Sequence, residues 1–358
     1  MANKKLVFKD GTVFCGISFG YDKEVVGPIE FNTSMFGYQT VAGDPTNIGK
    51  VIVLTYPIIG NFGTNEEDCE TKKATVAGVI CHEYNHEPSN FRFTQTYHEY
   101  LEESKVPLLS GVDTRAIVRK IRDEGNQVVA IVDETKTLEE ALELINNYEE
   151  PKTLVSKVSS KKKTILRAIG AKYNVACIDL GTKRGLLNKM NEYKCNVTVL
   201  PYNVSAHDIL ALNPKGLIIT DGPGNPNDLV EVIETIKALI GKLPILAVGL
   251  GQLLVAKAYG LDVYELKHGH HGANVPVRNV ITKKIEITGQ NHNYTVCRKS
   301  FEGSNLVITH ENVEDNTVEG FMDADNKVSC VLYRPWEQTC DYSEYIFKDF
   351  ESLVKEVK

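Results

Sequence analysis

The sequence predicts an α/β protein of two domains, in which a β-rich α+β domain precedes a doubly wound domain built on a parallel sheet. Three observations predict this arrangement. The chain has 358 residues, which is long enough for two hydrophobic cores. Its first third reads as short strands separated by turns. From Tyr173 onward, apolar strands alternate with helical patterns, as in parallel sheets covered by helices.

The composition excludes several functional classes. Hydrophobic residues make up 42% of the chain and charged residues 24%, which is typical of a soluble globular protein. The formal net charge of −7 does not favour nucleic acid or anionic lipid as a partner. No apolar run reaches the roughly 20 residues that a membrane span needs, and the N-terminus has no apolar signal-peptide core. We therefore expect a cytoplasmic protein with no nucleic-acid or membrane partner.

The first domain is expected to cover residues 1–150. Two strands, 4–9 and 12–19, flank an Asp10-Gly11 turn, which is a strong hairpin signal. A buried strand is expected at 51–56. Helical patterns follow at 94–104, 113–123 and 137–147.

Residues 151–170 are expected to form a linker. This part of the chain begins with Pro151, contains several serines and includes three consecutive lysines at 161–163. Such a composition is typical of a solvated connection between domains.

The second domain is expected to cover residues 171–358. Ligands of a doubly wound sheet bind at the carboxyl ends of its strands. Two glycine-rich corners, 221–226 and 249–251, follow predicted strands directly, so we expect them to line one pocket. The expected strands of the parallel sheet are 175–180, 197–201, 217–220 and 244–248; a strand pair within 285–296, a strand at 328–332 and a helix at 343–357 follow.

The stretch from Pro244 to Gly260 is the one around which the second domain is organised. An apolar strand meets a tight Gly-Leu-Gly corner and continues as a helix, which is the pattern of a nucleophile elbow. Such a corner lifts one side chain to the N-terminus of a helix, where the helix dipole favours a developing anion. The lifted residue is Gly249, which has no side chain.

The order of several segments resembles a known family. FNTSMFGYQ, Thr55-Tyr56-Pro57, DGPGNP, the elbow, GHHGANVPV and GQNHNY occur in this order in the small subunit of carbamoyl-phosphate synthetase. The similarity covers essentially the whole chain. Its C-terminal half also resembles class I glutamine amidotransferases, which implies a flavodoxin-like fold for the second domain.

The resemblance implies an activity and a partner. In this family a cysteine at the elbow attacks the amide carbon of glutamine, a histidine held by a glutamate moves the proton, and backbone N–H groups hold the oxyanion. The ammonia passes to a large subunit that makes carbamoyl phosphate, in pyrimidine and arginine biosynthesis. The resemblance therefore implies no cofactor, and it implies a heterodimer with that large subunit.

Three positions of the catalytic triad depart from the family pattern. Gly249 stands at the cysteine of G-x-C-x-G-H-Q, and Arg334 and Trp336 stand at the histidine and glutamate of H-P-E. Arginine is a permanent cation and cannot act as a base near neutral pH. We expect Trp336 to fill the vacated space by bulk, and Arg334 to pair with a carboxylate such as Glu337.

The glutamine pocket is expected to survive only as a vestige. Leu253 replaces the glutamine of the elbow motif, unless a one-residue slip lets Gln252 take its place. The pocket glycines are explained equally well by tight turns. By the resemblance, the vestigial pocket comprises Thr46, Gly222, Gly224, Leu250, Leu253, Asn291, Asn293 and Tyr294.

No metal site is predicted. Cys81, His82 and His86 in CHEYNHE are interpreted as part of a loop, and Cys330 as a small core residue. The GHHG segment with His270 and His271 is interpreted as a structural loop, and His292 as positional.

These observations predict a small subunit that has lost glutamine hydrolysis and acts as a docking or regulatory partner of an ammonia-using large subunit. Glutamine is then a doubtful ligand. Two alternatives stay open: an ordinary glutamine-hydrolysing small subunit that supplies ammonia, and a stand-alone ligand-binding pseudoenzyme.

Overall fold

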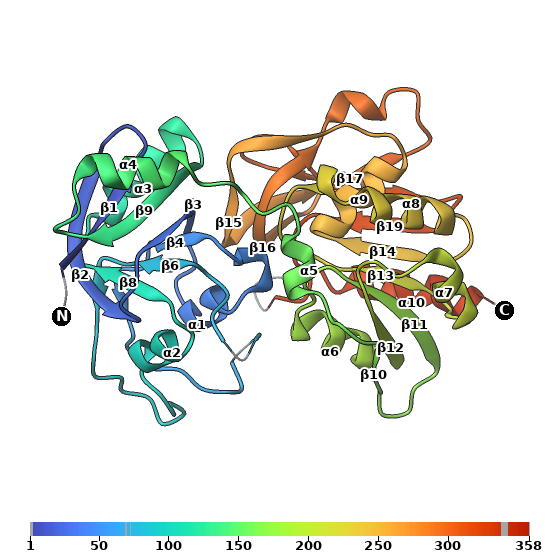
Figure 1. Cartoon of the computed structure of the whole chain (residues 1–358). Helices are drawn as coiled ribbons and strands as arrows, with labels where there is room; N and C mark the ends of the chain where they lie inside the picture. The colour runs from blue at the N-terminus through green and yellow to red at the C-terminus, as the bar shows by residue number, and fades with distance from the viewer. Residues whose placement is uncertain (1–2, 69, 72, 338–342, 358) are drawn as a thin grey trace. The chain divides into compact units, whose positions relative to one another are not determined.

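The chain divides into two compact units, Met1–Pro151 and Lys152–Lys358, in the computed structural model (Figure 1). The structure describes residues 3–68, 70–71, 73–337 and 343–357. Within these ranges we find no helix that could span a lipid bilayer.

The first unit is a closed barrel with the strand order β1-β2-β8-β6-β4-β3-β9. The predicted hairpin is confirmed: β1 and β2 pair antiparallel, and the Asp10 carboxylate accepts a hydrogen bond from the Thr12 N–H in the turn. Leu6, Val53 and Ile131 fill the barrel interior. The barrel strands are β1 (Asn3–Phe8), β2 (Val13–Gly20), β3 (Val25–Asn32), β4 (Val51–Leu54), β6 (Gly78–Ile80), β8 (Pro107–Ser110) and β9 (Gln127–Asp133). The short strands β5 (Ile58–Ile59) and β7 (Glu83–Tyr84) pair with each other outside the barrel.

Helices of the first unit begin at side chains that cap them. The hydroxyls of Thr96 and Thr137 each accept a backbone N–H of the first turn, in capping boxes completed by Glu99 and Glu140. Asp113 caps a third helix in the same way. The three predicted helices are confirmed as α2 (Tyr97–Glu103), α3 (Thr114–Glu124) and α4 (Leu138–Asn146); α1 (Tyr38–Ala42) and the 3₁₀ turn η1 (Pro45–Asn47) precede them.

The segment expected to be a linker, 151–170, carries regular structure. It contains α5 (Leu154–Val158) and β10 (Thr164–Leu166), and β10 pairs antiparallel with β12 of the second unit. Leu154 and Val155 are buried. These two apolar side chains explain the difference, because a solvated linker would expose them to water.

The second unit is built on one sheet, ordered β10-β12-β11-β13-β14-β19-β18-β16-β15-β17. Strands β12, β11, β13, β14 and β19 are parallel, and their order along the chain is 2-1-3-4-5. This is the flavodoxin-like doubly wound order, as the sequence predicts. The parallel strands are β11 (Tyr173–Asp179), β12 (Cys195–Pro201), β13 (Leu217–Ile219), β14 (Ile245–Val248) and β19 (Val328–Val331).

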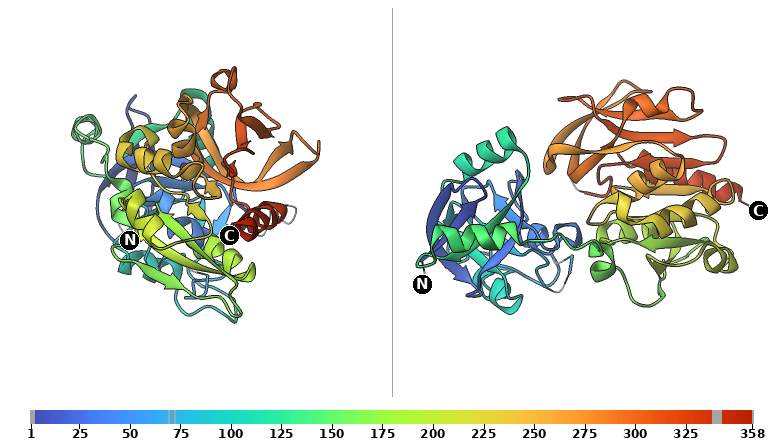
Figure 2. Two further views of the ribbon diagram at one scale, coloured as in Figure 1. Left: turned by 90° about the vertical axis from the view of Figure 1, so that its right-hand side faces the viewer. Right: turned by 45° about the horizontal axis from the view of Figure 1, so that its top comes forward.

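Helices cover both faces of the parallel part of this sheet (Figure 2). Leu217 and Ile219 of β13 pack with the helices of one face, whereas Ile218 packs with those of the other. Alternate residues of a strand point to opposite faces, so a fully apolar strand is buried on both. One face carries α7 (Ala206–Ala211), α8 (Val230–Leu239) and α9 (Leu250–Ala258), and the other carries α6 (Arg184–Glu192) and α10 (Tyr345–Glu356).

The GHHG segment is not a loop, so this expectation was wrong. It lies within the long strand β15 (Val263–Asn279), which pairs with β16 (Ile285–Val296). Register shifts on both sides of His270–Gly272 let these glycine-flanked residues stay in the ladder. The remaining antiparallel strands are β17 (Val307–Asn312) and β18 (Val318–Asp323), and 3₁₀ turns lie at Pro226–Asp228 and Arg298–Phe301.

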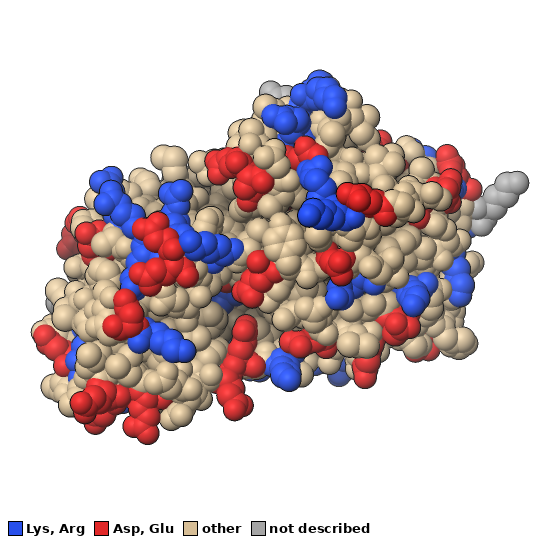
Figure 3. Space-filling view, turned by 90° about the horizontal axis from the view of Figure 1, so that it is seen from above, with Lys and Arg blue, Asp and Glu red and all other residues tan. Residues whose placement is uncertain are grey.

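Acidic and basic side chains are interspersed on the face drawn in Figure 3, and neither sign dominates it.

Candidate functional site

The elbow has the backbone geometry of a nucleophile turn. Strand β14 ends at Val248, α9 begins at Leu250, and Gly249 between them has φ 55° and ψ −122°. Residues with side chains rarely adopt a positive φ, and such strain is typical of an elbow that presents a nucleophile. The Gly249 N–H donates to the Val331 carbonyl of the neighbouring strand, which fixes the corner to the sheet.

The space beside Gly249 is filled by Asp221. This residue follows β13, the neighbour of β14 in the sheet, and it is buried. A Cβ atom built on Gly249 would overlap the Asp221 carboxylate and would lie 2.9 Å from the Cβ atom of Asp221. A side chain at position 249 and Asp221 in its present position therefore exclude each other.

Four hydrogen bonds hold the Asp221 carboxylate in place. Its Oδ1 atom accepts the N–H groups of Gly222 at 2.8 Å and Leu250 at 3.1 Å. Its Oδ2 atom accepts two N–H groups of Arg334, Nε at 3.1 Å and Nη2 at 3.0 Å. An anion at the first turn of a helix is favoured by the helix dipole. The Leu250 N–H, at the position where a nucleophile elbow offers an oxyanion donor, thus already binds a carboxylate of the protein.

Arg334 has a different main partner from the expected one. Glu337 does lie near it, with 3.5 Å between Nη1 and Oε1. The two shorter bonds, however, go to Asp221, and both Arg334 and Asp221 are buried. Lys183 lies 3.9 Å from Glu337. We call Lys183, Asp221, Arg334 and Glu337, whose charges alternate in sign, the elbow charge cluster.

Sequence reasoning missed Asp221 as the partner. The two residues are 113 positions apart, and only the sheet brings them together. One signal was available: a carboxylate that follows one parallel strand directly lies beside the corner that follows the next strand.

Trp336 is buried against the face of the sheet that α6 covers. It belongs to the same buried cluster as Leu186 and Leu187 of α6, and it lies so close to Gly185 that a Cβ atom there would overlap the ring. Its Nε1 atom has no hydrogen-bond partner within the described residues. The role of this side chain as a filler of the vacated site stays a prediction.

The pocket glycines each meet a local structural demand. A Cβ atom on Gly222 would overlap the carbonyl oxygen of Leu180, so the backbones approach too closely for a side chain. Gly224 has φ 95°, which favours glycine at a tight turn. Both glycines are accounted for without a ligand.

Leu253 and Gln252 are both buried in α9. Leu253 belongs to the hydrophobic core on the face of the sheet that α7, α8 and α9 cover. Neither polar atom of the Gln252 side chain has a hydrogen-bond partner in the part of the chain that the structure describes. A buried amide without a hydrogen-bond partner lowers stability, so Gln252 is less favourable at its position than Leu253 is.

The remaining expected pocket residues have partners outside the elbow charge cluster. The Asn291 and Asn293 side chains both meet His271, at 2.6 Å from its Nδ1 and 3.0 Å from its Nε2. Tyr294 follows on the same strand and packs partly on the core. Thr46 belongs to the first unit, where its N–H and hydroxyl donate to Asp44 Oδ1. The second unit thus gathers Gly222, Gly249, Leu250 and Arg334 around Asp221.

Two thiols that the sequence analysis weighed are buried. Cys330 lies in the core, and burial raises its pKa well above the ordinary value. Burial raises the pKa of Cys81 to about 12. Neither thiol would ionise near neutral pH, which fits the interpretation of Cys330 as a core residue.

Comparisons with known proteins cover both units. Residues 6–131 match the family described as "Carbamoyl-phosphate synthase small chain, CPSase domain", and residues 176–350 match "Glutamine amidotransferase class-I". The carbamoyl phosphate synthase small chain of Oceanobacillus iheyensis is 39% identical, over 100% of this chain and 98% of the relative. That of Staphylococcus saprophyticus is 37% identical, over the same shares of the two chains. That of Fusobacterium nucleatum is 38% identical, over 98% of each chain. A solved structure described as a GMP synthase subunit of Thermoplasma acidophilum matches 51% of this chain and 94% of its own, with 16% identity and a TM-score of 0.45.

Proposed function

The chain belongs to the family of carbamoyl phosphate synthase small chains, and from this premise we propose that it is a small subunit without glutamine hydrolysis, which docks on or regulates an ammonia-using large subunit. By the family's role, that partner makes carbamoyl phosphate in the cytoplasm for pyrimidine and arginine biosynthesis. The two chains form a heterodimer, and the small one needs no cofactor.

The observation that carries this proposal is the occupancy of the elbow. Amide hydrolysis of this type needs a nucleophile, a base and free oxyanion donors. Position 249 is a glycine, the N–H of Leu250 binds the Asp221 carboxylate, and Arg334 binds the other oxygen of that carboxylate. Loss of a triad nucleophile alone costs a rate factor on the order of a million in a serine protease.

Docking makes fewer demands on the sequence than catalysis does. It requires the fold and a surface, both of which the family relationship over the full chain supports. Catalysis requires three particular side chains at three positions. This chain keeps the family fold but has other residues at all three catalytic positions. Such a combination fits a subunit retained for assembly or regulation. The vestigial pocket at Gly222, Gly224 and Leu250 is then expected not to bind glutamine.

The test compares two nitrogen donors. The chain is reconstituted with the large subunit from the same organism, and carbamoyl phosphate formation is measured with bicarbonate, ATP and either glutamine or ammonium. We expect ammonium to support synthesis and glutamine to give no more than the background without a nitrogen donor. The purified large subunit by itself is the control, because any change that the small chain makes to the ammonium-dependent rate reports its regulatory role.

Two outcomes would overturn the proposal. Glutamine-supported turnover would show an ordinary glutamine-hydrolysing small subunit. Failure of the chain to bind the large subunit in a pull-down would favour a stand-alone ligand-binding pseudoenzyme.

A further inference from the structure

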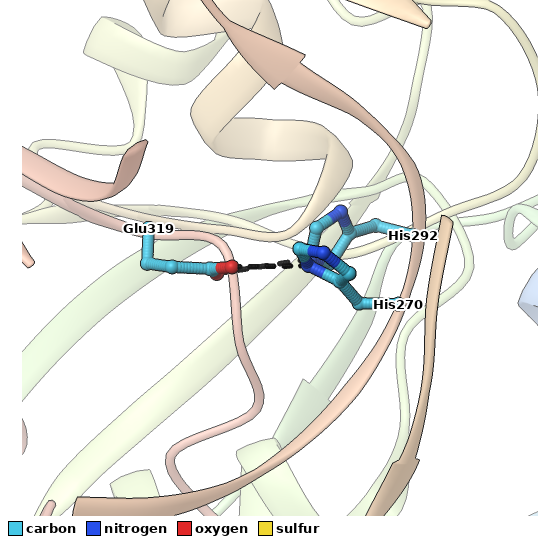
Figure 4. A group of neighbouring side chains, drawn as sticks. All are labelled: His270, His292 and Glu319. Atoms are coloured by element: carbon cyan, nitrogen blue, oxygen red, sulfur yellow. Dashed lines mark hydrogen bonds and ion pairs between the residues drawn. The ribbon is translucent and has the colours of Figure 1, made fainter. Parts of the chain in front are cut away.

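A second polar cluster lies outside the elbow charge cluster, on three adjacent antiparallel strands. His270 of β15 stands directly opposite His292 of β16, and Glu319 lies on β18, which also pairs with β16. The Nδ1 atom of His270 is 3.2 Å from Oε1 of Glu319, and the Nε2 atom of His292 is 3.6 Å from Oε2. Figure 4 shows both rings beside the carboxylate of Glu319.

We propose that His270, His292 and Glu319 bind a divalent transition-metal ion of the zinc type. Their candidate ligand atoms, one from each residue, all lie within 4.8 Å of one another. Two imidazole nitrogens and a carboxylate oxygen, with no thiolate, form a donor set that zinc accepts. Among the described residues this is the group with such spacing, whereas the Cys81–His86 segment is not part of one.

The outer nitrogens of both rings support this assignment. The Nε2 atom of His270 lies 2.9 Å from an oxygen of Asp315, and the Nδ1 atom of His292 lies 3.0 Å from the carbonyl oxygen of Tyr294. Histidines that bind metals almost always donate their other ring N–H to a carboxylate or a backbone carbonyl, which orients the ring. Here one ring uses each kind of acceptor, and each ring turns its other nitrogen toward Glu319.

The carboxylate of Glu319 is the second support. Its side chain is completely buried, yet its Oε2 atom has no hydrogen-bond partner within the described part of the chain. A buried carboxylate oxygen without such a partner is costly. A cation bound between Glu319 and His292 would satisfy this oxygen.

Gln290 offers a fourth ligand. Its Oε1 atom lies 3.1 Å from Nε2 of His292, and its amide nitrogen donates to the Thr288 hydroxyl at 3.2 Å. The amide oxygen therefore points toward the inner nitrogen of His292. Two nitrogens and two oxygens would complete the four-coordinate shell that zinc prefers.

A purely protein-based arrangement is the competing explanation. In it, His270 carries protons on both nitrogens and forms ion pairs with Asp315 and Glu319. That arrangement satisfies Oε1 of Glu319 but leaves Oε2 facing His292 at 3.6 Å. The two explanations differ in whether added metal binds.

The experiment is a titration of the full-length chain with Zn²⁺ after treatment with a chelator and its removal. Calorimetry is expected to show one equivalent bound with micromolar affinity or better. Co²⁺ in its place is expected to give the visible absorption of a four-coordinate site. Zinc should also raise the midpoint of thermal unfolding, because a ligand that binds only the folded state stabilises it.

Three variants separate a built site from adventitious binding. His292→Gln is expected to abolish this binding, and Asp315→Asn to weaken it about 10- to 100-fold by releasing the His270 ring. His268→Gln, a control on the same strand as His270, is expected to bind as the unaltered chain does. A chain that binds no zinc, or equal binding by the unaltered chain and His292→Gln, would overturn the proposal. Neither result depends on the nitrogen donor of the synthetase, so the two proposals fail independently.

Discussion

At the residue scale, the elbow depends on one buried ion pair. The Asp221 carboxylate accepts two N–H groups of the Arg334 guanidinium, and both residues are about 5% exposed. A buried pair adds little net stability over an apolar pair of the same shape, but removal of one partner leaves an uncompensated buried charge.

Arg334→Met is therefore expected to lower the free energy of unfolding by about 3 to 5 kcal/mol. Urea denaturation followed by circular dichroism measures this change. Lys348→Met is the matched control, since Lys348 pairs with Glu344 on the exposed side of α10 and its loss should cost less than about 1 kcal/mol. Combining Arg334→Met with Asp221→Asn should recover part of the loss. Equal, small effects of Arg334→Met and Lys348→Met would contradict a desolvated pair.

A second prediction at this scale concerns position 249. Gly249→Cys is expected to destabilise the chain by at least about 2 kcal/mol, because it combines a positive φ with an overlap on Asp221. In the Asp221→Ala background the overlap with the carboxylate is removed and only the 2.9 Å approach to the Cβ atom remains, so the same substitution should cost at least about 1 kcal/mol less.

The four proteins of this double-mutant cycle are compared by their free energies of unfolding. Additive effects at positions 249 and 221 would contradict the close approach of the two residues. Because Asp221 occupies the space beside position 249, a cysteine placed there is not expected, by itself, to give glutamine hydrolysis.

At the element scale, α10 is fixed to the antiparallel strands by a buried histidine. His310 of β17 hydrogen-bonds to the Tyr345 hydroxyl of α10, and Asn279 of β15 donates to the same hydroxyl. Burial lowers the pKa of His310 to about 4, against a smaller opposing effect of the Glu319 charge. The ring is therefore neutral in the folded state near neutral pH.

This pKa makes the docking of α10 pH-dependent. In the unfolded chain the ring takes up a proton near pH 6.5, whereas in the folded state it resists protonation until about pH 4. The stability that His310 contributes is present above pH 6.5 and is lost as the pH falls toward 4, by up to about 3 kcal/mol.

We expect His310→Gln to remove this component of the pH dependence. The measurement is the free energy of unfolding between pH 4 and 7.5 for both proteins, and their difference isolates the histidine from the carboxylates that titrate in the same range. His207→Gln is the control, because the His207 side chain in α7 is 91% exposed and its surroundings change little on unfolding. Parallel curves for the unaltered chain and His310→Gln would show that His310 ionises normally in the fold.

At the scale of the whole molecule, the family relationship spans both units, and the positions that we assign to the triad, Gly249, Arg334 and Trp336, all belong to the second. Each unit has its own hydrophobic core, so changes at the elbow do not require changes in the barrel. This separation is what the proposed function requires, because a change at the elbow leaves the core of the first unit intact. The comparison of glutamine with ammonium tests the proposal at this scale, since it needs both units and the partner subunit.

The sequence by itself was sufficient for the doubly wound fold, whereas the assignment of Gly249, Arg334 and Trp336 to the triad positions stays a prediction. Strand and helix periods are local, so residues within one element reveal them, and the strands at Val175, Val197, Leu217 and Ile245 were all predicted. The absence of a side chain at Gly249 is likewise a local fact. Sequence reasoning also anticipated that Arg334 needs a carboxylate, but it named Glu337, the nearest one along the chain.

Only the tertiary structure decided which residues meet. Asp221 reaches Arg334 and the elbow because β13, β14 and β19 are neighbours in the sheet. The same reason applies to His270, His292 and Glu319, which lie on three neighbouring antiparallel strands. The register of these strands could not be predicted, because the segment with His270 was interpreted as a loop. Ion pairs and ligand sets depend on strand order and register, which are set by the burial of distant apolar residues rather than by the sequence near each charge.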